Sequence, residues 1–130
     1  MALSIRQLHP VIGGEVSGLD LRLPLSPADA LAIHAGMDRY AVLVFHDQDI
    51  TDEQQMAFAL NFGQREDARG GTVTKAKDYR LDSGLNDVSN LGKDGKPLAK
   101  DSRTHLFNLG NCLWHSDSSF RPIPAKFSLL

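Results

Sequence analysis

The stretch NCLWHSDSSF, from Asn111 to Phe120, places a histidine and an aspartate one residue apart. On an extended strand, residues i and i+2 project from the same face, so His115 and Asp117 would lie side by side while Ser116 faces away. Two histidines and one carboxylate can bind Fe(II) on one face and leave the opposite positions open for other ligands. The pattern therefore predicts two ligands of a metal site, and the third must come from elsewhere.

The spacing of this pair is weak evidence when taken alone. The chain holds five histidines and thirteen aspartates, so about half a His-x-Asp pair is expected by chance. Two alternatives stay open: a solvated or hydrogen-bonded histidine, and a purely structural domain in which His115 and Asp117 bond each other. Nucleophilic catalysis through Cys112 has little support, because a free cysteine is more often a small buried hydrophobe than a reactive thiolate.

The residues around the pair extend the pattern along most of the chain. A Leu-Trp dipeptide precedes it and Ser-Ser-Phe follows it. Four further segments contribute: GGEVSGLDL (13–21), AVLVF (41–45), QQxxFAxxFG (54–63) and DVSN (87–90). In this order the segments resemble the family of taurine dioxygenase and 2,4-dichlorophenoxyacetate dioxygenase, which are non-haem Fe(II) enzymes dependent on 2-oxoglutarate. The octapeptide Leu113–Phe120 and the turn Asp94–Lys96 resemble the phenoxyacetate branch in particular.

The resemblance implies that His115 and Asp117 are two of the three ligands of Fe(II). It also implies 2-oxoglutarate as the cosubstrate and dioxygen as the oxidant, with release of succinate and CO2. In the family, the distal histidine ligand and the arginine that binds 2-oxoglutarate come well after the His-x-Asp motif, and members run to roughly twice this length. We therefore assign neither of them here, and the other four histidines are left without a ligand role: His9, His34, His46 and His105.

The resemblance also implies a site for a small anionic substrate. Asn111 matches a position that lines the substrate pocket, and Ser119 matches a further pocket position in the phenoxyacetate branch. Lys96 and Lys75 resemble loop lysines that meet the anionic group, with a solvated surface charge as the alternative for both. The expected substrate is a phenoxyalkanoate-like carboxylate. The alternatives are a taurine or alkylsulfonate dioxygenase, and a non-catalytic fragment that lacks the distal histidine and arginine.

The family implies an α+β fold, mainly β: a double-stranded β-helix of the jelly-roll kind with outer helices, incomplete in this chain. Residues 1–130 would form the N-terminal part of a single domain. Short apolar runs separated by glycines predict strands within 8–23, and AVLVF predicts a strand at 41–45 that is buried on both faces. The segments Asp87–Leu91 and Pro124–Leu130 are also expected to be strands.

Two helices and a long loop are predicted from local signals. Ser26 is an N-cap followed by a proline, which predicts a helix to about Tyr40. The capping box Thr51–Gln54 opens a second helix, which Gly63 would end. Between residues 64 and 104, charged residues and glycines predict a long loop or lid over the site, ordered chiefly when cosubstrate and substrate are bound.

The composition bears on partners and location. The formal net charge of −2 gives no general electrostatic attraction for nucleic acid, which requires a strongly basic domain or stripe. A single cysteine cannot form an intrachain disulfide, and no run is apolar enough over enough residues to span a bilayer. We expect a cytoplasmic protein with no nucleic-acid or membrane partner, and self-association into a homo-oligomer is left open.

Overall fold

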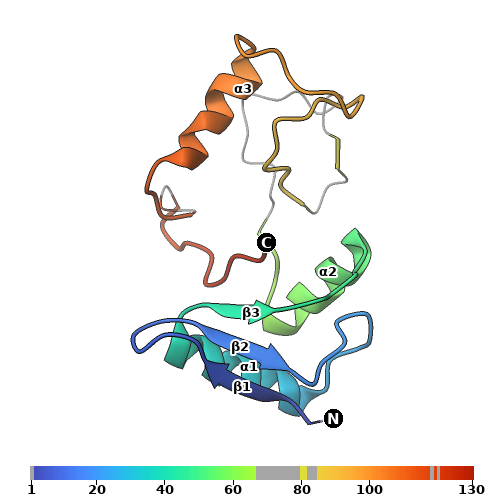
Figure 1. Ribbon diagram of the computed structural model, residues 1–130, viewed down its shortest axis with the longest axis vertical. Helices are drawn as coiled ribbons and strands as arrows, with labels where there is room; N and C mark the ends of the chain where they lie inside the picture. The colour runs from blue at the N-terminus through green and yellow to red at the C-terminus, as the bar shows by residue number, and fades with distance from the viewer. Residues whose placement is uncertain (1, 67–79, 82–84, 118, 120) are drawn as a thin grey trace. The chain divides into compact units, whose positions relative to one another are not determined.

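The computed structural model describes residues 2–66, 80–81, 85–117, 119 and 121–130 (Figure 1). These residues form two compact units, Met1–Arg65 and Glu66–Leu130. The first unit carries a three-stranded sheet and the longer helices, and the second carries a short helix and the His-x-Asp pair. An α+β organisation is therefore confirmed.

The sheet of the first unit is mixed. Strand β1 (Ser4–Gln7) pairs antiparallel with β2 (Gly14–Ser17), and β2 pairs parallel with β3 (Leu43–Phe45), in the order β1-β2-β3. Helix α1 (Pro27–Tyr40) connects the two parallel strands, as a parallel pair requires a crossover (Figure 1). Gly36 of α1 lies so close to the sheet that a Cβ there would meet Ile5 at 2.5 Å.

The predicted helix starts are confirmed. The Ser26 side chain accepts a hydrogen bond from the Asp29 backbone N–H at 3.1 Å, and α1 begins at Pro27. The capping box at Thr51 opens α2 (Asp52–Ala59), with both of its reciprocal hydrogen bonds present. A short 3₁₀ helix, η1 (Leu60–Phe62), follows and ends at Gly63. Side-chain caps satisfy backbone groups that a helix end leaves unpaired, and this explains why such short motifs locate the ends well.

The core of the first unit is small. Phe58 of α2 is buried, and its ring makes edge-on contacts with Phe45 at 5.6 Å and with Phe62 at 5.1 Å between centroids. Among the described residues, the other buried apolar side chains are Val16 on β2, Leu21 after β2 and Ile33 on α1. Because few large side chains are buried, each contributes a large share of the stability of this unit.

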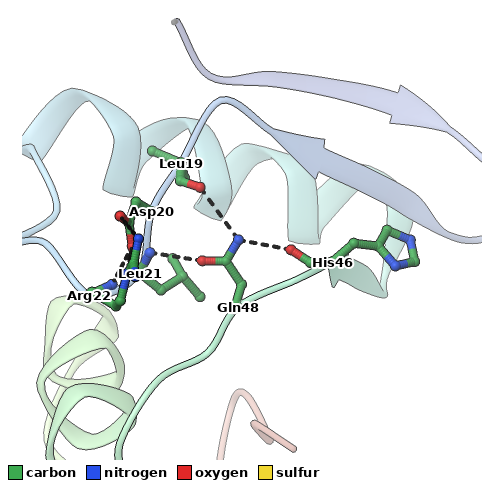
Figure 2. A network of polar contacts seen from close by, with 6 residues as sticks. All are labelled: Leu19, Asp20, Leu21, Arg22, His46 and Gln48. Atoms are coloured by element: carbon green, nitrogen blue, oxygen red, sulfur yellow. Dashed lines mark hydrogen bonds and ion pairs between the residues drawn. The ribbon is translucent and has the colours of Figure 1, made fainter.

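The Gln48 side chain connects two loops through hydrogen bonds (Figure 2). Its Oε1 accepts a hydrogen bond from the Leu21 N–H at 2.9 Å, and its Nε2 donates to the carbonyl of His46 at 2.9 Å and of Leu19 at 3.4 Å. Gln48 thereby joins the segment that follows β2 to the segment that follows β3.

The same segment after β2 carries a surface ion pair. Asp20 accepts two hydrogen bonds from the Arg22 guanidinium, at 2.8 and 2.7 Å (Figure 2). These bonds, together with one from the Arg22 backbone N–H, lower the pKa of the Asp20 carboxyl to about 2. Asp20 therefore stays ionised at any pH at which the chain is expected to function.

A groove of about 250 Å³ runs between the segment 21–25 and helix α2 in the first unit. Its lining is mainly apolar and consists of Leu21, Arg22, Leu23, Pro24, Leu25, Gln54, Ala57, Phe58 and Asn61. None of the site residues predicted from the sequence lines this groove.

Several expected strands are absent from the described residues. Of 8–23, only Gly14–Ser17 is a strand, because Gly13 and Gly18 take positive φ angles of 94° and 84° that end it. The strand predicted at 41–45 is shorter and only half buried, since Ala41 adopts a left-handed conformation after α1. Conversely, β1 was not predicted, because the sequence SIRQ lacks the apolar alternation of a typical strand.

The second unit also differs from expectation. Neither Asp87–Leu91 nor Pro124–Leu130 is a strand; the former contributes only an isolated bridge between Leu91 and Pro97. An extended segment becomes a strand only when a partner supplies a continuous ladder of hydrogen bonds. Among the described residues, 87–91 has this one bridge and 124–130 has no strand partner. Over the whole chain, the described residues form more helix than strand. The described part of the chain is therefore not mainly β.

Among the described residues of the second unit, two short helices precede the His-x-Asp pair. Helix α3 (Arg103–Asn108) begins after Ser102, whose side chain caps it by accepting from the His105 N–H at 3.2 Å. The 3₁₀ helix η3 (Leu109–Cys112) continues directly from it. Among the described residues, no helix has the length and apolar character needed to cross a membrane.

Candidate metal site

His115 and Asp117 lie just after η3, and their side chains meet. The Nε2 atom of His115 is 3.2 Å from the Oδ1 atom of Asp117. The expected strand geometry is wrong, because the described residues of this segment have no ladder partner and are not in a strand. The expected juxtaposition is nevertheless present. Extended backbone at Leu113 (φ −94°, ψ 148°) ends η3 and leads the chain into the pair.

The imidazole of His115 is oriented by the backbone that precedes it. Its Nδ1 atom is 2.7 Å from the carbonyl oxygen of Leu113, so Nδ1 carries a proton and donates it to that oxygen. This arrangement leaves Nε2 facing the carboxylate of Asp117. Metal-binding histidines commonly donate the other ring N–H to a carbonyl in this way, which fixes the tautomer that presents a lone pair to the ion.

The carboxylate of Asp117 is oriented from the opposite side. Its Oδ2 atom accepts a hydrogen bond from the Ser128 hydroxyl at 2.7 Å, while Oδ1 faces His115. The side chains of His115 and Asp117 are 46% and 60% exposed, so solvent and solutes reach the pair directly. Ser128 was not predicted from the sequence, because a contact eleven positions along an irregular segment leaves no periodic signal.

The separation of the two facing atoms suits a proton or a metal ion between them. When Nε2 is unprotonated, its lone pair points at an oxygen lone pair 3.2 Å away, which is unfavourable unless a proton or a metal ion lies between them. Two neighbouring donors on an octahedral ion, each bonded at about 2.1 Å, lie about 3.0 Å apart. The observed separation therefore suits both a hydrogen bond in the protonated pair and two adjacent positions on a divalent metal.

The described residues do not complete a metal site. They contain no group of three histidine, cysteine, aspartate or glutamate side chains arranged to hold an ion. His46 instead contacts Glu15 at 3.3 Å and His34 packs against Phe62.

Three of the four predicted substrate residues are described, and all three lie at the surface of the second unit. Asn111 lies in η3 and Ser119 lies two residues after Asp117, and both are exposed. Lys96 is also exposed, in a turn held by a hydrogen bond from its N–H to Asp94 at 3.1 Å and by Gly95 at φ 73°. Lys75 lies outside the described residues. Among the hydrogen bonds of the described residues, none links these side chains to the His115–Asp117 pair.

The protonation of His115 is expected to shift toward higher pH in the metal-free protein. The Leu113 carbonyl is the main cause of the raised pKa of His115, and the charge of Asp117 adds to it. A raised pKa means that the contacts of the protonated imidazole, first with the Leu113 carbonyl and then with Asp117, stabilise the folded chain below the pKa, and that this contribution is lost as pH rises through it. NMR titration of the His115 imidazole C–H signals measures this pKa. The substitution Asp117→Asn is expected to lower the midpoint of the titration. An unshifted midpoint in the unsubstituted chain would contradict this.

The comparisons with known proteins identify the family. Residues 4–130 match the family described as "Taurine catabolism dioxygenase TauD, TfdA family". The match extends over nearly the whole chain, from β1 through the His-x-Asp pair to the last residue. The chain belongs to this family.

Individual relatives are similar over the whole chain. The chain is 40% identical to an alpha-ketoglutarate-dependent 2,4-dichlorophenoxyacetate dioxygenase of Burkholderia sp. (strain RASC). This match covers 100% of the chain and 43% of the relative. The chain is 32% identical, over 96% of its length and 38% of the relative's, to an (S)-phenoxypropionate/alpha-ketoglutarate-dioxygenase of Sphingobium herbicidovorans. The chain thus spans less than half the length of these relatives.

A solved structure is more similar still. The crystal structure of AAD-2 in complex with Mn(II) and N-oxalylglycine superposes with a TM-score of 0.91 at 82% sequence identity. The match covers 97% of this chain and 44% of AAD-2. The fold described above is therefore the fold of the corresponding part of a larger dioxygenase-family protein.

Proposed function

We propose that the chain supplies the His-x-Asp part of an Fe(II)- and 2-oxoglutarate-dependent dioxygenase that hydroxylates a small anionic, phenoxyalkanoate-like substrate. The observation that carries the proposal is the orientation of Nε2 of His115 and Oδ1 of Asp117 toward one common point, 3.2 Å apart. The relatives support the class of reaction, because those compared above depend on alpha-ketoglutarate and act on phenoxy acids by their names.

In this proposal, His115 and Asp117 hold the metal through Nε2 and Oδ1. AAD-2 supports a divalent ion and a 2-oxo acid at the site, because it was crystallised with Mn(II) and N-oxalylglycine, whose oxalyl group resembles the 2-oxo acid end of 2-oxoglutarate. The bound metal and cosubstrate would supply dioxygen activation, and overall the substrate, dioxygen and 2-oxoglutarate become hydroxylated substrate, succinate and CO2. The protein fixes the donor atoms in place, through Leu113 for the imidazole and Ser128 for the carboxylate.

We further propose that Asn111, Ser119 and Lys96 bind the substrate, together with Lys75. A carboxylate attracts an ammonium group and accepts hydrogen bonds from amide and hydroxyl donors. The exposed positions of Asn111, Ser119 and Lys96 leave their side chains available for such contacts. With a phenoxyacetate, hydroxylation of the carbon beside the ether oxygen gives a hemiacetal, which breaks down to a phenol and glyoxylate.

The wider expectations stay proposals for the protein to which this chain belongs. They are a double-stranded β-helix architecture, a lid that includes residues 64–104, a cytoplasmic location and self-association. The chain is highly similar to less than half of AAD-2. This supports the proposal that the remaining strands and the third ligand correspond to the part of AAD-2 that the match leaves out.

Succinate formation tests the proposed reaction. We would compare the chain alone with the AAD-2 hybrid, defined as this chain joined to the portion of AAD-2 that the match leaves out. Each is supplied with Fe(II), 2-oxoglutarate and a panel of phenoxyalkanoates and alkylsulfonates. We expect no turnover by the chain alone, because the described residues provide only two ligands, and succinate from the hybrid with phenoxyalkanoates.

The Burkholderia sp. dioxygenase serves as the positive control for the assay. Succinate formed chiefly with sulfonates would favour the taurine-type alternative. A folded hybrid that forms no succinate with any substrate, while the control enzyme turns over, would reject the dioxygenase function for this chain.

A further inference from the structure

Among the described residues, few contacts hold the carboxylate of Asp117 in one orientation. More than half of its side-chain surface is exposed, and rotation about the bond to a carboxyl group is broad and roughly two-fold. Without a further contact, either oxygen could face His115, or neither. A ligand that rotates freely must lose this freedom when it binds an ion, which weakens binding.

One hydrogen bond of the described residues restrains this rotation. The Ser128 hydroxyl donates to Oδ2 at 2.7 Å, and the direction is settled because an ionised carboxylate only accepts. With Oδ2 engaged, Oδ1 is the oxygen that faces Nε2 of His115. We propose that Ser128 is a positioning residue that presents Oδ1 of Asp117 for metal binding. This inference rests on the proposed function.

The position of Ser128 in the chain supports a role that is specific to the site. It lies eleven residues after Asp117, in an irregular tail that was expected to form a strand. Ser128 is itself exposed, so its hydroxyl does not fill a core. Substitution of such a surface serine usually changes stability little. An effect on metal binding can therefore be separated from an effect on folding.

Mn(II) binding to the full chain measures the contribution of Ser128. Paramagnetic broadening of the His115 ring signals in a Mn(II) titration gives an apparent Kd even when binding is weak. We expect Ser128→Ala to weaken binding by about tenfold, since loss of a group that orients a ligand costs about 10- to 100-fold in affinity. Ser128→Thr keeps a hydroxyl at the same place and should restore most of the affinity.

A matched control comes from the first unit. Ser17 shares a hydrogen bond with Ser4 at 2.8 Å, so Ser17→Ala also removes one surface hydroxyl and one hydrogen bond. This variant should bind Mn(II) like the unsubstituted chain. In the metal-free protein, Ser128→Ala but not Ser17→Ala should also shift the ¹³Cγ signal of Asp117, which tests the contact independently of the metal.

The outcomes are distinguishable. Equal Mn(II) affinity of the Ser128→Ala variant and the unsubstituted chain would overturn the inference, as would a Ser128→Thr variant that folds and carries the same defect. If the unsubstituted chain shows no broadening at His115 at any Mn(II) concentration, the metal site itself is rejected and the inference is rejected with it. Backbone amide spectra of each variant establish that the fold is retained.

Discussion

Asp117→Ala is expected to lower the affinity of the chain for Mn(II) by more than about 100-fold, because it removes a ligand, whereas loss of a group that only orients a ligand already costs about 10- to 100-fold. The remaining imidazole of His115 would hold the ion alone. In the AAD-2 hybrid, the same substitution should reduce succinate formation to background. Mn(II) titration and the succinate assay measure the two effects.

A second carboxylate provides the control for this prediction. Asp101 is exposed and lies in the second unit before α3, so Asp101→Ala removes the same charge without touching the pair. This variant should keep its affinity for Mn(II). If the His115–Asp117 contact is purely structural, both variants will bind Mn(II) equally, and the metal role fails.

Phe58→Ala is expected to reduce the free energy of unfolding of the first unit by about 3–5 kcal/mol, the usual cost of replacing a buried phenylalanine by alanine. Phe58 is one of few buried apolar residues, and its ring contacts both Phe45 on β3 and Phe62 on η1. Its removal would leave a cavity between the sheet and α2. Since whole domains are stable by only about 5–15 kcal/mol, this substitution would remove a large part of the stability of the unit.

Urea unfolding, monitored through hydrogen exchange of the backbone amides of β2 and β3, measures the change in the free energy of unfolding. Leu60→Ala is the matched control, because Leu60 is 59% exposed beside the same helix and its truncation removes little buried surface. We expect a change of less than about 0.5 kcal/mol for this control. Similar destabilisation by both substitutions would show that Phe58 is not the centre of this core.

Helices α1 and α2 were predicted well because their start signals act within a few residues, whereas α3 was not predicted. Ser26 and Thr51 each accept a backbone hydrogen bond from the residue three positions on, so local sequence alone contains the interaction. The strands were predicted poorly. A strand depends on partners from other parts of the chain. Among the described residues, segment 87–91 has only the single bridge from Leu91 to Pro97, and segment 124–130 has no strand partner.

The contact between His115 and Asp117 was predicted for a reason that is only partly right, and their metal role stays a prediction. The contact between His115 and Asp117 is present, but a carbonyl at Leu113 and a hydroxyl at Ser128 orient it, in place of the alternation of a strand. The one-residue spacing alone was weak evidence for a metal site. The family resemblance gave stronger support for that hypothesis, because it depended on matches along the whole chain. The substrate residues Asn111, Ser119, Lys96 and Lys75 stay predictions.

Anomalous diffraction from Mn(II)-soaked crystals of the chain would test the site most directly. We predict a single strong peak at bonding distance, about 2.0–2.3 Å, from both Nε2 of His115 and Oδ1 of Asp117. Metal density elsewhere, with Nε2 and Oδ1 still in direct contact at 3.2 Å, would contradict the proposal that this pair holds the catalytic metal.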